Sequence, residues 1–251
     1  QRAGPDDGLA PACLQVFLTG IDTQPKVWGL VPAGGRGERF GGETPKQLVE
    51  AAGKPVLLWT VERLLGAGLA VLTVALPEGW LVSMPESLRF HDDCVSLVAG
   101  GANRQQSVAA CLADCPNDVD LVLVHDGARP AVSVRDVAAT IAAVGDDDGA
   151  VLGRPVVDTL KRLEGGRVAE TVDRTPLFRA ETPQVFRRDV LTRAVETSAR
   201  DGFVGTDEAA IVERLAGVRI NAAMATEPNP KLTERQDLLQ IQLLLQQDGG
   251  S

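Results

Sequence analysis

Short runs of apolar residues alternate along this chain with longer segments in which apolar residues recur every three or four positions. The short runs are typical of buried strands, and the longer segments are typical of helices. Because the two alternate, the pattern predicts a Rossmann-like, doubly wound α/β fold with a mostly parallel sheet and ligands at the strands' carboxyl ends. The predicted strands are residues 27–31, 69–76, 94–98, 121–125 and 218–223, and the predicted helices are residues 56–65, 103–112, 133–144, 187–199, 206–215 and 233–246.

One stretch interrupts this alternation and predicts a projecting β-arm at about residues 153–178. Residues 156–163 and 167–172 have an extended character, and they flank Glu164-Gly165-Gly166, which is a hairpin turn signal. A hairpin cannot bury both of its faces alone. We therefore expect the arm to pack on another subunit, with a lid over its own site as the alternative.

Composition and charge limit the classes of protein that fit. The chain has 251 residues, of which 44% are hydrophobic, as in ordinary globular proteins. Its formal net charge of −9 argues against binding to nucleic acid or to an anionic membrane. The apolar runs are strand-sized, shorter than the roughly 20 residues that cross a bilayer. Residues 1–26 lack periodicity, so we expect a flexible extension followed by one domain over residues 27–251. Because these residues also lack signal-peptide features, we expect a cytoplasmic location.

The first predicted strand runs directly into a glycine-rich segment, residues 32–42. Glycines let backbone N–H groups approach phosphate oxygens where a Cβ atom would collide. The spacing matches neither a Walker loop nor a dinucleotide-binding motif. Arg36, Arg39 and Lys46 lie within or just after the segment, and such cations in an acidic chain indicate a polyanion ligand. Because Pro45 restricts the backbone before it, Lys46 is a candidate for stabilising transition-state charge.

Another group of candidates follows the predicted strand at residues 121–125. Asp126 is expected to point into the crevice, where its carboxylate would suit Mg²⁺ that bridges phosphates. Gly127 allows close approach of a ligand, and Arg129 has the geometry to bind a phosphate. His125 is predicted to pack behind Asp126 rather than to act in catalysis.

Further candidates lie in three separate loops. Gly100-Gly101 joins a predicted strand to its helix, which places a second glycine-rich turn at a helix N-terminus. Ser107 in that helix is expected to cap it or to contact a ligand. Arg174 on the returning edge of the arm and Lys231 after Pro228-Asn229-Pro230 are weaker candidates, because single cations are often surface charges.

Taken together and in this order, the motifs resemble those of the 2-C-methyl-D-erythritol 4-phosphate cytidylyltransferase family. The resemblance extends from about residue 27 to the end of the chain, whereas the first glycine-rich segment alone would indicate only the wider nucleotidyltransferase superfamily. The segments that carry it are residues 32–39 with 45–47, Gly100-Gly101 with Arg104 and Ser107, and residues 125–130, 158–159, 172–174, 182–184, 206–208 and 231–233.

The resemblance implies transfer of CMP from CTP to methylerythritol 4-phosphate, with release of pyrophosphate, in the non-mevalonate route to isoprenoids. It implies a nucleotidyltransferase-type fold, Mg²⁺ held by Asp126, and a homodimer formed through the arm. The implied catalytic residues are Arg39, Lys46, Arg174 and Lys231. The implied CTP contacts are Pro32, Ala33, Gly34, Gly35, Gly37, Gly100, Gly101, Ser107, Asp126 and Gly127. The implied polyol phosphate contacts are Arg129, Thr159, Arg174, Thr182 and Lys231, with Thr159 and Arg174 supplied by the partner's arm.

Two alternatives stay open at this point. One is a cytidylyltransferase for another polyol phosphate, such as ribitol 5-phosphate. The other is a catalytically idle module that binds a nucleotide or a protein partner, although a scaffold has no need for Arg39 and Lys46 beside Asp126. A phosphate nucleophile is already anionic at neutral pH, so the implied reaction needs no general base. The proline pair around Asn229 departs from the family's usual loop and bears on the reach of Lys231.

Overall fold

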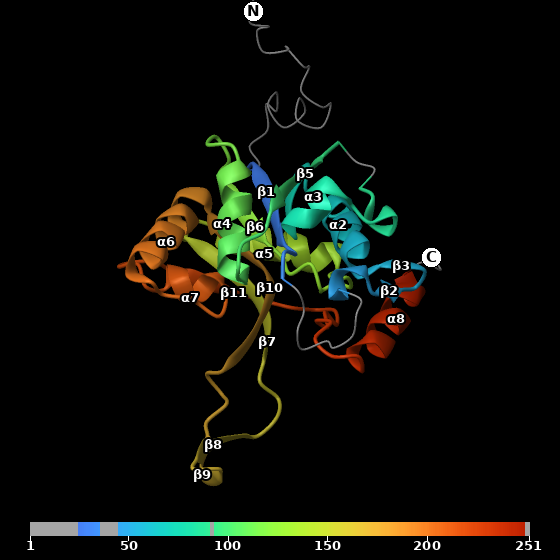
Figure 1. Cartoon of the computed structure of the whole chain (residues 1–251). Coiled ribbons are helices and arrows are strands. Elements are labelled where there is room, and N and C mark those ends of the chain that lie inside the picture. Colours follow the sequence, from blue (N-terminus) through green and yellow to red (C-terminus); the bar gives the residue numbers. More distant parts are fainter. Residues whose placement is uncertain (1–24, 36–44, 91–92, 249–251) are drawn as a thin grey trace, which may run out of the picture.

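A seven-stranded sheet forms the centre of the molecule (Figure 1). The computed structural model describes residues 25–35, 45–90 and 93–248, so most of the predicted N-terminal extension lies outside the described residues. Strand β10 is antiparallel to both of its neighbours, and the other pairs in the sheet are parallel. The predicted α/β fold with a mostly parallel sheet is therefore confirmed. The strands in spatial order are β11 (Ile220–Met224), β7 (Gly149–Pro155), β10 (Phe178–Arg187), β6 (Leu121–Val124), β1 (Val27–Pro32), β4 (Val71–Leu76) and β5 (Val95–Ala99).

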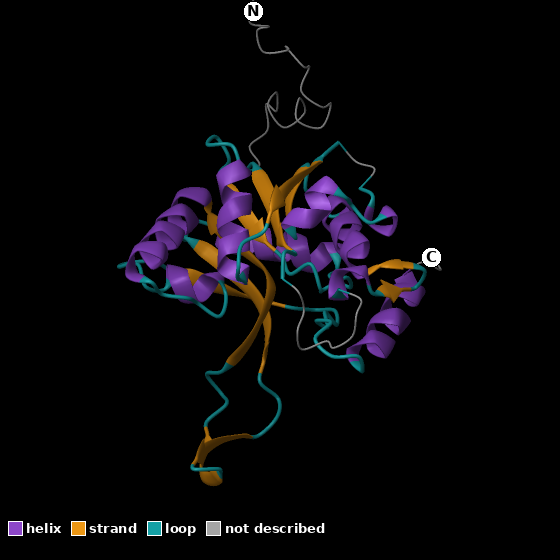
Figure 2. Ribbon diagram, in the orientation of Figure 1, coloured by secondary structure: helices purple, strands orange, loops and turns teal. Residues whose placement is uncertain are grey.

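Helices cover both faces of this sheet (Figure 2). Neighbouring strand residues face opposite sides: Leu30 packs in the core beneath α4, α6 and α7, whereas Val31 packs in the core beneath α2 and α5. No helix in the described ranges is long and apolar enough to span a bilayer. The helices are α2 (Val56–Gly66), α3 (Glu78–Val82), α4 (Arg104–Asp114), α5 (Val134–Val144), α6 (Arg188–Asp201), α7 (Glu208–Val212) and α8 (Asp237–Asp248), with 3-10 turns η2 (Lys46–Leu48) and η3 (Glu86–Leu88).

Side-chain caps determine where α4 and α5 begin. The Asn103 side chain accepts a hydrogen bond from the backbone N–H of Gln106 and starts α4. The Ser133 hydroxyl accepts one from the backbone N–H of Asp136 and starts α5. Because β1, β4, β5 and β6 are parallel, their carboxyl ends and the loops that follow meet at one edge of the sheet.

The predicted hairpin is present as β8 (Leu160–Glu164) and β9 (Arg167–Val172), which pair antiparallel. Gly165 and Gly166 form its turn with φ values of 56° and 78°, a backbone conformation that favours glycine. The hairpin projects away from the sheet between β7 and β10 (Figures 1 and 2). Leu163 is 62% exposed and Val168 is 63% exposed, so the arm presents apolar side chains that this chain does not cover.

Strand β10 is the largest difference from the predicted elements. Its sequence carries Arg179, Glu181 and Gln184, so it lacks the continuous apolar run of the predicted parallel strands. Strand β7, helix α3 and the small hairpin of β2 (Glu50–Ala51) and β3 (Lys54–Pro55) were also not predicted. Helix α7 begins at Glu208, directly after its cap Asp207, and ends at Val212, so it is shorter than the predicted helix at both ends. Helix α8 begins at Asp237 rather than at residue 233.

Candidate active site

A pocket opens at the edge where the carboxyl ends of β1 and β6 meet. Residues from the first glycine-rich segment, from α4 and from the segment after β6 line it together, although they are far apart in the sequence. The residues that line this first pocket are Pro32, Ala33, Gly34, Gly35, Lys46, Gln47, Arg104, Ser107, Asp126, Gly127, Ala128 and Lys231. The predicted site residues Gly37 and Arg39 lie outside the described residues.

The two glycine-rich turns pack directly against each other at this pocket. A Cβ atom on Gly34 would lie 2.9 Å from the Gly100 Cα, and one on Gly100 would lie 2.8 Å from the Gly34 Cα. The backbone would have to move to admit either side chain, so glycine is required at both positions. The buried Ser107 hydroxyl accepts a hydrogen bond from the Gly101 N–H at 3.1 Å and donates one to the Asn103 carbonyl at 3.0 Å. Ser107 therefore fixes the second turn against the start of α4.

Lys46 is held at the pocket by the residue that follows it. The Gln47 side chain is buried, and its Nε2 donates hydrogen bonds to the Ala33 carbonyl at 2.6 Å and to the Gly35 carbonyl. These bonds fasten η2 to the first glycine-rich turn. The role of Gln47 was not predicted from the sequence, although it directly follows Lys46 in the quoted motif.

The Asp126 carboxylate lies at the centre of a cluster of cations. Its Oδ1 accepts a hydrogen bond from Arg104 Nε at 2.8 Å, and its Oδ2 lies 2.7 Å from Lys231 Nζ and 3.5 Å from Arg129 Nε. Burial acts to raise the pKa of Asp126, but the charges of Arg104 and Lys231 outweigh it and hold the pKa well below its usual range. Asp126 is therefore an ionised carboxylate at neutral pH.

The loop with the proline pair brings Lys231 to the site. Asn229 Nδ2 donates to the Thr182 carbonyl at 2.7 Å, and Arg129 Nη1 donates to the Asn229 carbonyl at 2.6 Å. The Leu232 N–H donates to the Ala128 carbonyl at 2.8 Å. The departure at Pro228-Asn229-Pro230 therefore does not prevent Lys231 from reaching Asp126.

A second pocket of about 510 Å³ shares Lys231 with the first. Arg129, Arg154 and Arg179 line it beside Glu181, so cations outnumber acids on its wall. The predicted site residue Thr182 contacts residues of both pockets. Its hydroxyl accepts a hydrogen bond from the N–H of Asp126 at 3.1 Å, and its carbonyl accepts one from Asn229. The charge of the second pocket suits a phosphorylated ligand.

The remaining predicted site residues, Thr159 and Arg174, lie on the arm and not at either pocket. Both are exposed, and Arg174 Nη1 donates a hydrogen bond to the Val157 carbonyl. The arm leaves the sheet at the carboxyl end of β7 and projects outward from that edge (Figure 1). One chain therefore does not bring these two residues together with Asp126.

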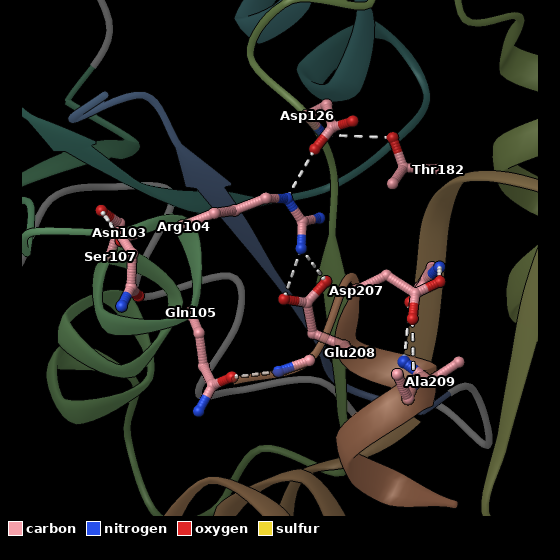
Figure 3. Close-up of polar contacts among 12 residues, drawn as sticks. Asn103, Arg104, Gln105, Ser107, Asp126, Thr182, Asp207, Glu208 and Ala209 are labelled. Atoms are coloured by element: carbon pink, nitrogen blue, oxygen red, sulfur yellow. Dashed lines mark hydrogen bonds and ion pairs between the residues drawn. The ribbon is translucent and has the colours of Figure 1, made fainter. Parts of the chain in front are cut away.

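Arg104 and Glu208 are functional candidates to which sequence reasoning gave no role. Arg104 bridges Asp126 on one side and Glu208 on the other, where its Nη1 lies 2.7 Å from each carboxylate oxygen (Figure 3). Burial acts to lower the pKa of Arg104, but Glu208 and Asp126 raise it above its usual value. Burial raises the pKa of Glu208, and the charge of Arg104 opposes this rise. The available signal was that Arg104 directly follows the cap of α4.

His125 is buried behind Asp126, as predicted, with Nε2 at 3.1 Å from the Arg129 carbonyl. Burial lowers its pKa to about 4 from the usual 6.5. A group whose pKa is lower in the folded state binds fewer protons there than in the unfolded chain. The free energy of unfolding therefore falls as the pH drops from about 6.5 towards 4.

The pH dependence of stability tests this assignment of His125. Between pH 7 and pH 5 we expect His125 to reduce the free energy of unfolding by about 2 kcal/mol, from about 1.4 kcal/mol per pH unit below its unfolded pKa. Urea denaturation of the wild type and of His125→Gln at both pH values measures the difference. Equal losses of stability in the two proteins would show that His125 is not the group responsible.

The acidic groups at the first pocket determine how many protein ligands a metal ion could have there. Asp126 is the acidic residue among those that line the first pocket. Within the ranges that the structure describes, no three acidic, histidine or cysteine side chains gather to hold a metal ion. Mg²⁺ often binds through one or two carboxylates together with substrate phosphates. The donor set therefore fits Mg²⁺ that shares its coordination with a bound triphosphate.

Comparisons with known proteins agree with this geometry. A model of the family IspD, 2-C-methyl-D-erythritol 4-phosphate cytidylyltransferase, matches residues 27–247. The enzyme of that name from Xanthomonas campestris pv. campestris (strain 8004) is 40% identical over 228 residues, which cover 87% of this chain and 84% of that protein. The enzyme of the same name from Bacillus pumilus (strain SAFR-032) is 35% identical over 224 residues, which cover 88% and 97%.

A solved structure leads to the same family. The crystal structure of 2-C-methyl-D-erythritol 4-phosphate cytidylyltransferase from Thermus thermophilus superposes with a TM-score of 0.73 at 32% identity. The superposition covers 88% of this chain and 99% of that one. From the matched length, the identity and the shared fold, we conclude that this chain belongs to the 2-C-methyl-D-erythritol 4-phosphate cytidylyltransferase family.

Proposed function

We propose that this chain transfers CMP from CTP to 2-C-methyl-D-erythritol 4-phosphate, forming 4-diphosphocytidyl-2-C-methyl-D-erythritol and pyrophosphate. The observation that carries the proposal is the first pocket, where Lys46, Arg104 and Lys231 lie around two packed glycine-rich turns. Family membership supports the choice of both substrates. The reaction belongs to the non-mevalonate route to isoprenoids, and its soluble phosphorylated substrates favour a cytoplasmic location.

In this reaction a phosphate oxygen of the polyol phosphate attacks the α-phosphorus of CTP in line. One P–O bond forms, the bond from the α-phosphorus to the oxygen that bridges it to the β-phosphate breaks, and pyrophosphate leaves with that oxygen. The nucleophile is already anionic, so positioning and charge stabilisation supply the rate. Lys46, fastened by Gln47, would offset the charge that develops on the α-phosphate and on the leaving group. Arg39 is proposed for the same task.

The first pocket is proposed to hold CTP and Mg²⁺. Asp126 would hold the ion together with triphosphate oxygens, and the bound ion would neutralise part of the phosphate charge. Base choice would come largely from backbone groups of the two glycine-rich turns. The proposed CTP contacts are Pro32, Ala33, Gly34, Gly35, Gly37, Gly100, Gly101, Ser107, Asp126 and Gly127.

The second pocket is proposed to take the polyol phosphate. Arg129 and Lys231 both line it, and Thr182 lies beside it on β10. A site that adjoins the first pocket through Lys231 would bring the attacking phosphate close to CTP. Thr159 and Arg174 would complete this site from the arm of a second copy of the chain.

The homodimer is supported by the exposed apolar side chains of the projecting arm. We expect a dimer by light scattering. Mixing two inactive variants, Arg174→Ala and Lys46→Ala, then tests whether Arg174 acts across the interface. In a mixed dimer, one site would have Lys46 from its own chain and Arg174 from the partner, so activity is expected to return. A monomer, or no return of activity in mixed dimers, would contradict the cross-subunit assignment.

The reaction itself is tested by pyrophosphate release with Mg²⁺ and CTP. The assay compares methylerythritol 4-phosphate with ribitol 5-phosphate, and CTP with ATP, GTP and UTP. We expect strong release only with CTP and methylerythritol 4-phosphate. Release with ribitol 5-phosphate instead would reassign the substrate, and no release with any pair would favour an idle nucleotide-binding module.

A further inference from the structure

We propose that Glu208 is a positioning residue of the nucleotide site, which fixes the Arg104 guanidinium for contact with the bound nucleotide. The proposal rests on the proposed function in one respect, namely that CTP occupies the first pocket. Glu208 itself does not line that pocket, so its action would pass through Arg104.

Arg104 pairs with two buried carboxylates while it lines the first pocket. The Glu208 side chain is 1% exposed, and both of its oxygens lie 2.7 Å from Arg104 Nη1. Arg104 Nε donates to Asp126 at 2.8 Å, so the guanidinium is held from two directions (Figure 3). The Arg104 side chain remains 28% exposed and lines the pocket. Its Nη2 has no hydrogen-bond partner among the described residues and is the donor left for a ligand.

Glu208 is in turn held by a rigid support. It is the first residue of α7, and Asp207 before it accepts a hydrogen bond from the Ala210 N–H at 2.9 Å. The Gln184 side chain on β10 donates to Asp207 at 2.8 Å and accepts from the Ala209 N–H at 3.0 Å. The start of α7 is thus bonded to a central strand of the sheet. Glu208 has little freedom to follow Arg104 if the guanidinium moves.

A second bridge fixes Arg104 from its own side. The neighbouring Gln105 side chain donates to the Phe203 carbonyl at 3.1 Å and accepts from the Gly205 N–H at 2.9 Å. These bonds tie the start of α4 to the loop that leads into α7. Both ends of the Arg104–Glu208 pair are therefore anchored, as a preorganised ligand contact requires.

The charges around Asp126 allow a test that distinguishes two effects of Glu208 on CTP binding, the positioning of Arg104 and a change in electrostatic attraction. Arg104, Arg129 and Lys231 face two carboxylates, Asp126 and Glu208. Removing the charge of Glu208 makes this group more positive, and attraction alone would then strengthen the binding of CTP. If Glu208 acts by positioning, CTP binding becomes weaker in spite of the added positive charge. The two explanations predict opposite changes.

The decisive variant is Glu208→Gln, which keeps the shape of the side chain and removes its charge. We expect the Kd and the KM for CTP to rise about tenfold, equivalent to about 1.4 kcal/mol, while the KM for the polyol phosphate changes less than about twofold. Arg104→Gln should weaken CTP binding at least as much as Glu208→Gln does. The double variant Arg104→Gln/Glu208→Gln should bind CTP no more weakly than Arg104→Gln alone. Glu213→Gln, which removes an exposed charge at the end of α7, should leave both KM values unchanged.

Calorimetric binding of CTP keeps this test separate from the test of the reaction. A wild type that binds CTP but releases no pyrophosphate would contradict the proposed reaction and still allow the Glu208 comparison. Unchanged or tighter CTP binding by a folded Glu208→Gln protein would overturn the positioning role, as would additive losses in the double variant. If Glu208→Gln does not fold, Arg104→Lys keeps the charge and removes the forked geometry. Weaker CTP binding by that variant supports the proposal, and unchanged binding overturns it.

Discussion

Replacing Lys46 with alanine is expected to lower the turnover number by about 100-fold or more, the scale for loss of one preorganised charge contact in a transition state. Lys46 lines the first pocket at the start of η2, and Gln47 fastens that turn to the carbonyls of Ala33 and Gly35. The backbone that carries Lys46 is thus held in place before substrate binds. Alanine removes the charge and leaves the fastening by Gln47 intact.

The measurement is kcat from pyrophosphate release at saturating CTP and methylerythritol 4-phosphate. Lys54→Ala is the matched control, because Lys54 pairs with Glu62 and stacks on Trp59 away from the pocket. That variant should turn over at close to the wild-type rate. Near wild-type turnover in Lys46→Ala would remove Lys46 from the catalytic residues.

Replacing Asp126 with asparagine is expected to reduce the free energy of unfolding by about 3 kcal/mol, the low end for removing one partner of a buried ion pair. The low end applies because Arg104 and Lys231 are 28% and 32% exposed, and solvent screens part of their charge. Asparagine keeps the volume of the side chain but leaves Lys231 and Arg129 without their paired carboxylate, while Arg104 keeps Glu208. Pyrophosphate release should fall as well, since the same carboxylate arranges the cations at the pocket.

The stability that Asp126 contributes depends on pH in a known direction. The pKa of Asp126 is depressed in the folded protein, so its contribution is complete above the pKa of the unfolded carboxyl and is lost as the pH falls through the folded value. Urea denaturation should therefore give the same difference between wild type and variant at pH 7 and at pH 6. Asp118→Asn, at an exposed pair with Lys26, should cost less than about 1 kcal/mol. Equal stability of Asp126→Asn and the wild type would show that solvent already compensates the cations.

The sequence allowed prediction of those parts of the fold that depend on local patterns. Runs such as residues 121–124 are apolar because both faces of the sheet are covered, and they predicted the parallel strands correctly. Strand β10 was missed because it brings polar side chains, among them Thr182 and Gln184, to the functional edge of the sheet. A strand that serves the site does not show the pattern of a strand that only fills the core.

The candidate site divides in the same way. Asp126 was found because its place after a buried strand determines where its carboxylate points. Arg104 was quoted in a motif but received no role, because its partner Glu208 lies 104 positions further along the chain. No spacing rule connects two residues that only the fold brings together. The reach of Lys231 likewise became clear only with the hydrogen bonds that hold its loop.

The place of β10 also has a consequence for the biosynthesis of this protein. The strand lies between β6 and β7, although both of those strands precede it in the chain. Until residues 178–187 leave the ribosome, β6 lacks its neighbour on one side, and β7 lacks both of its neighbours, β10 and β11. Such unpaired edges invite pairing between nascent chains. The central sheet is completed late in synthesis, when β10 inserts between β6 and β7. The hydrogen bond between Thr182 and Asp126 forms only then.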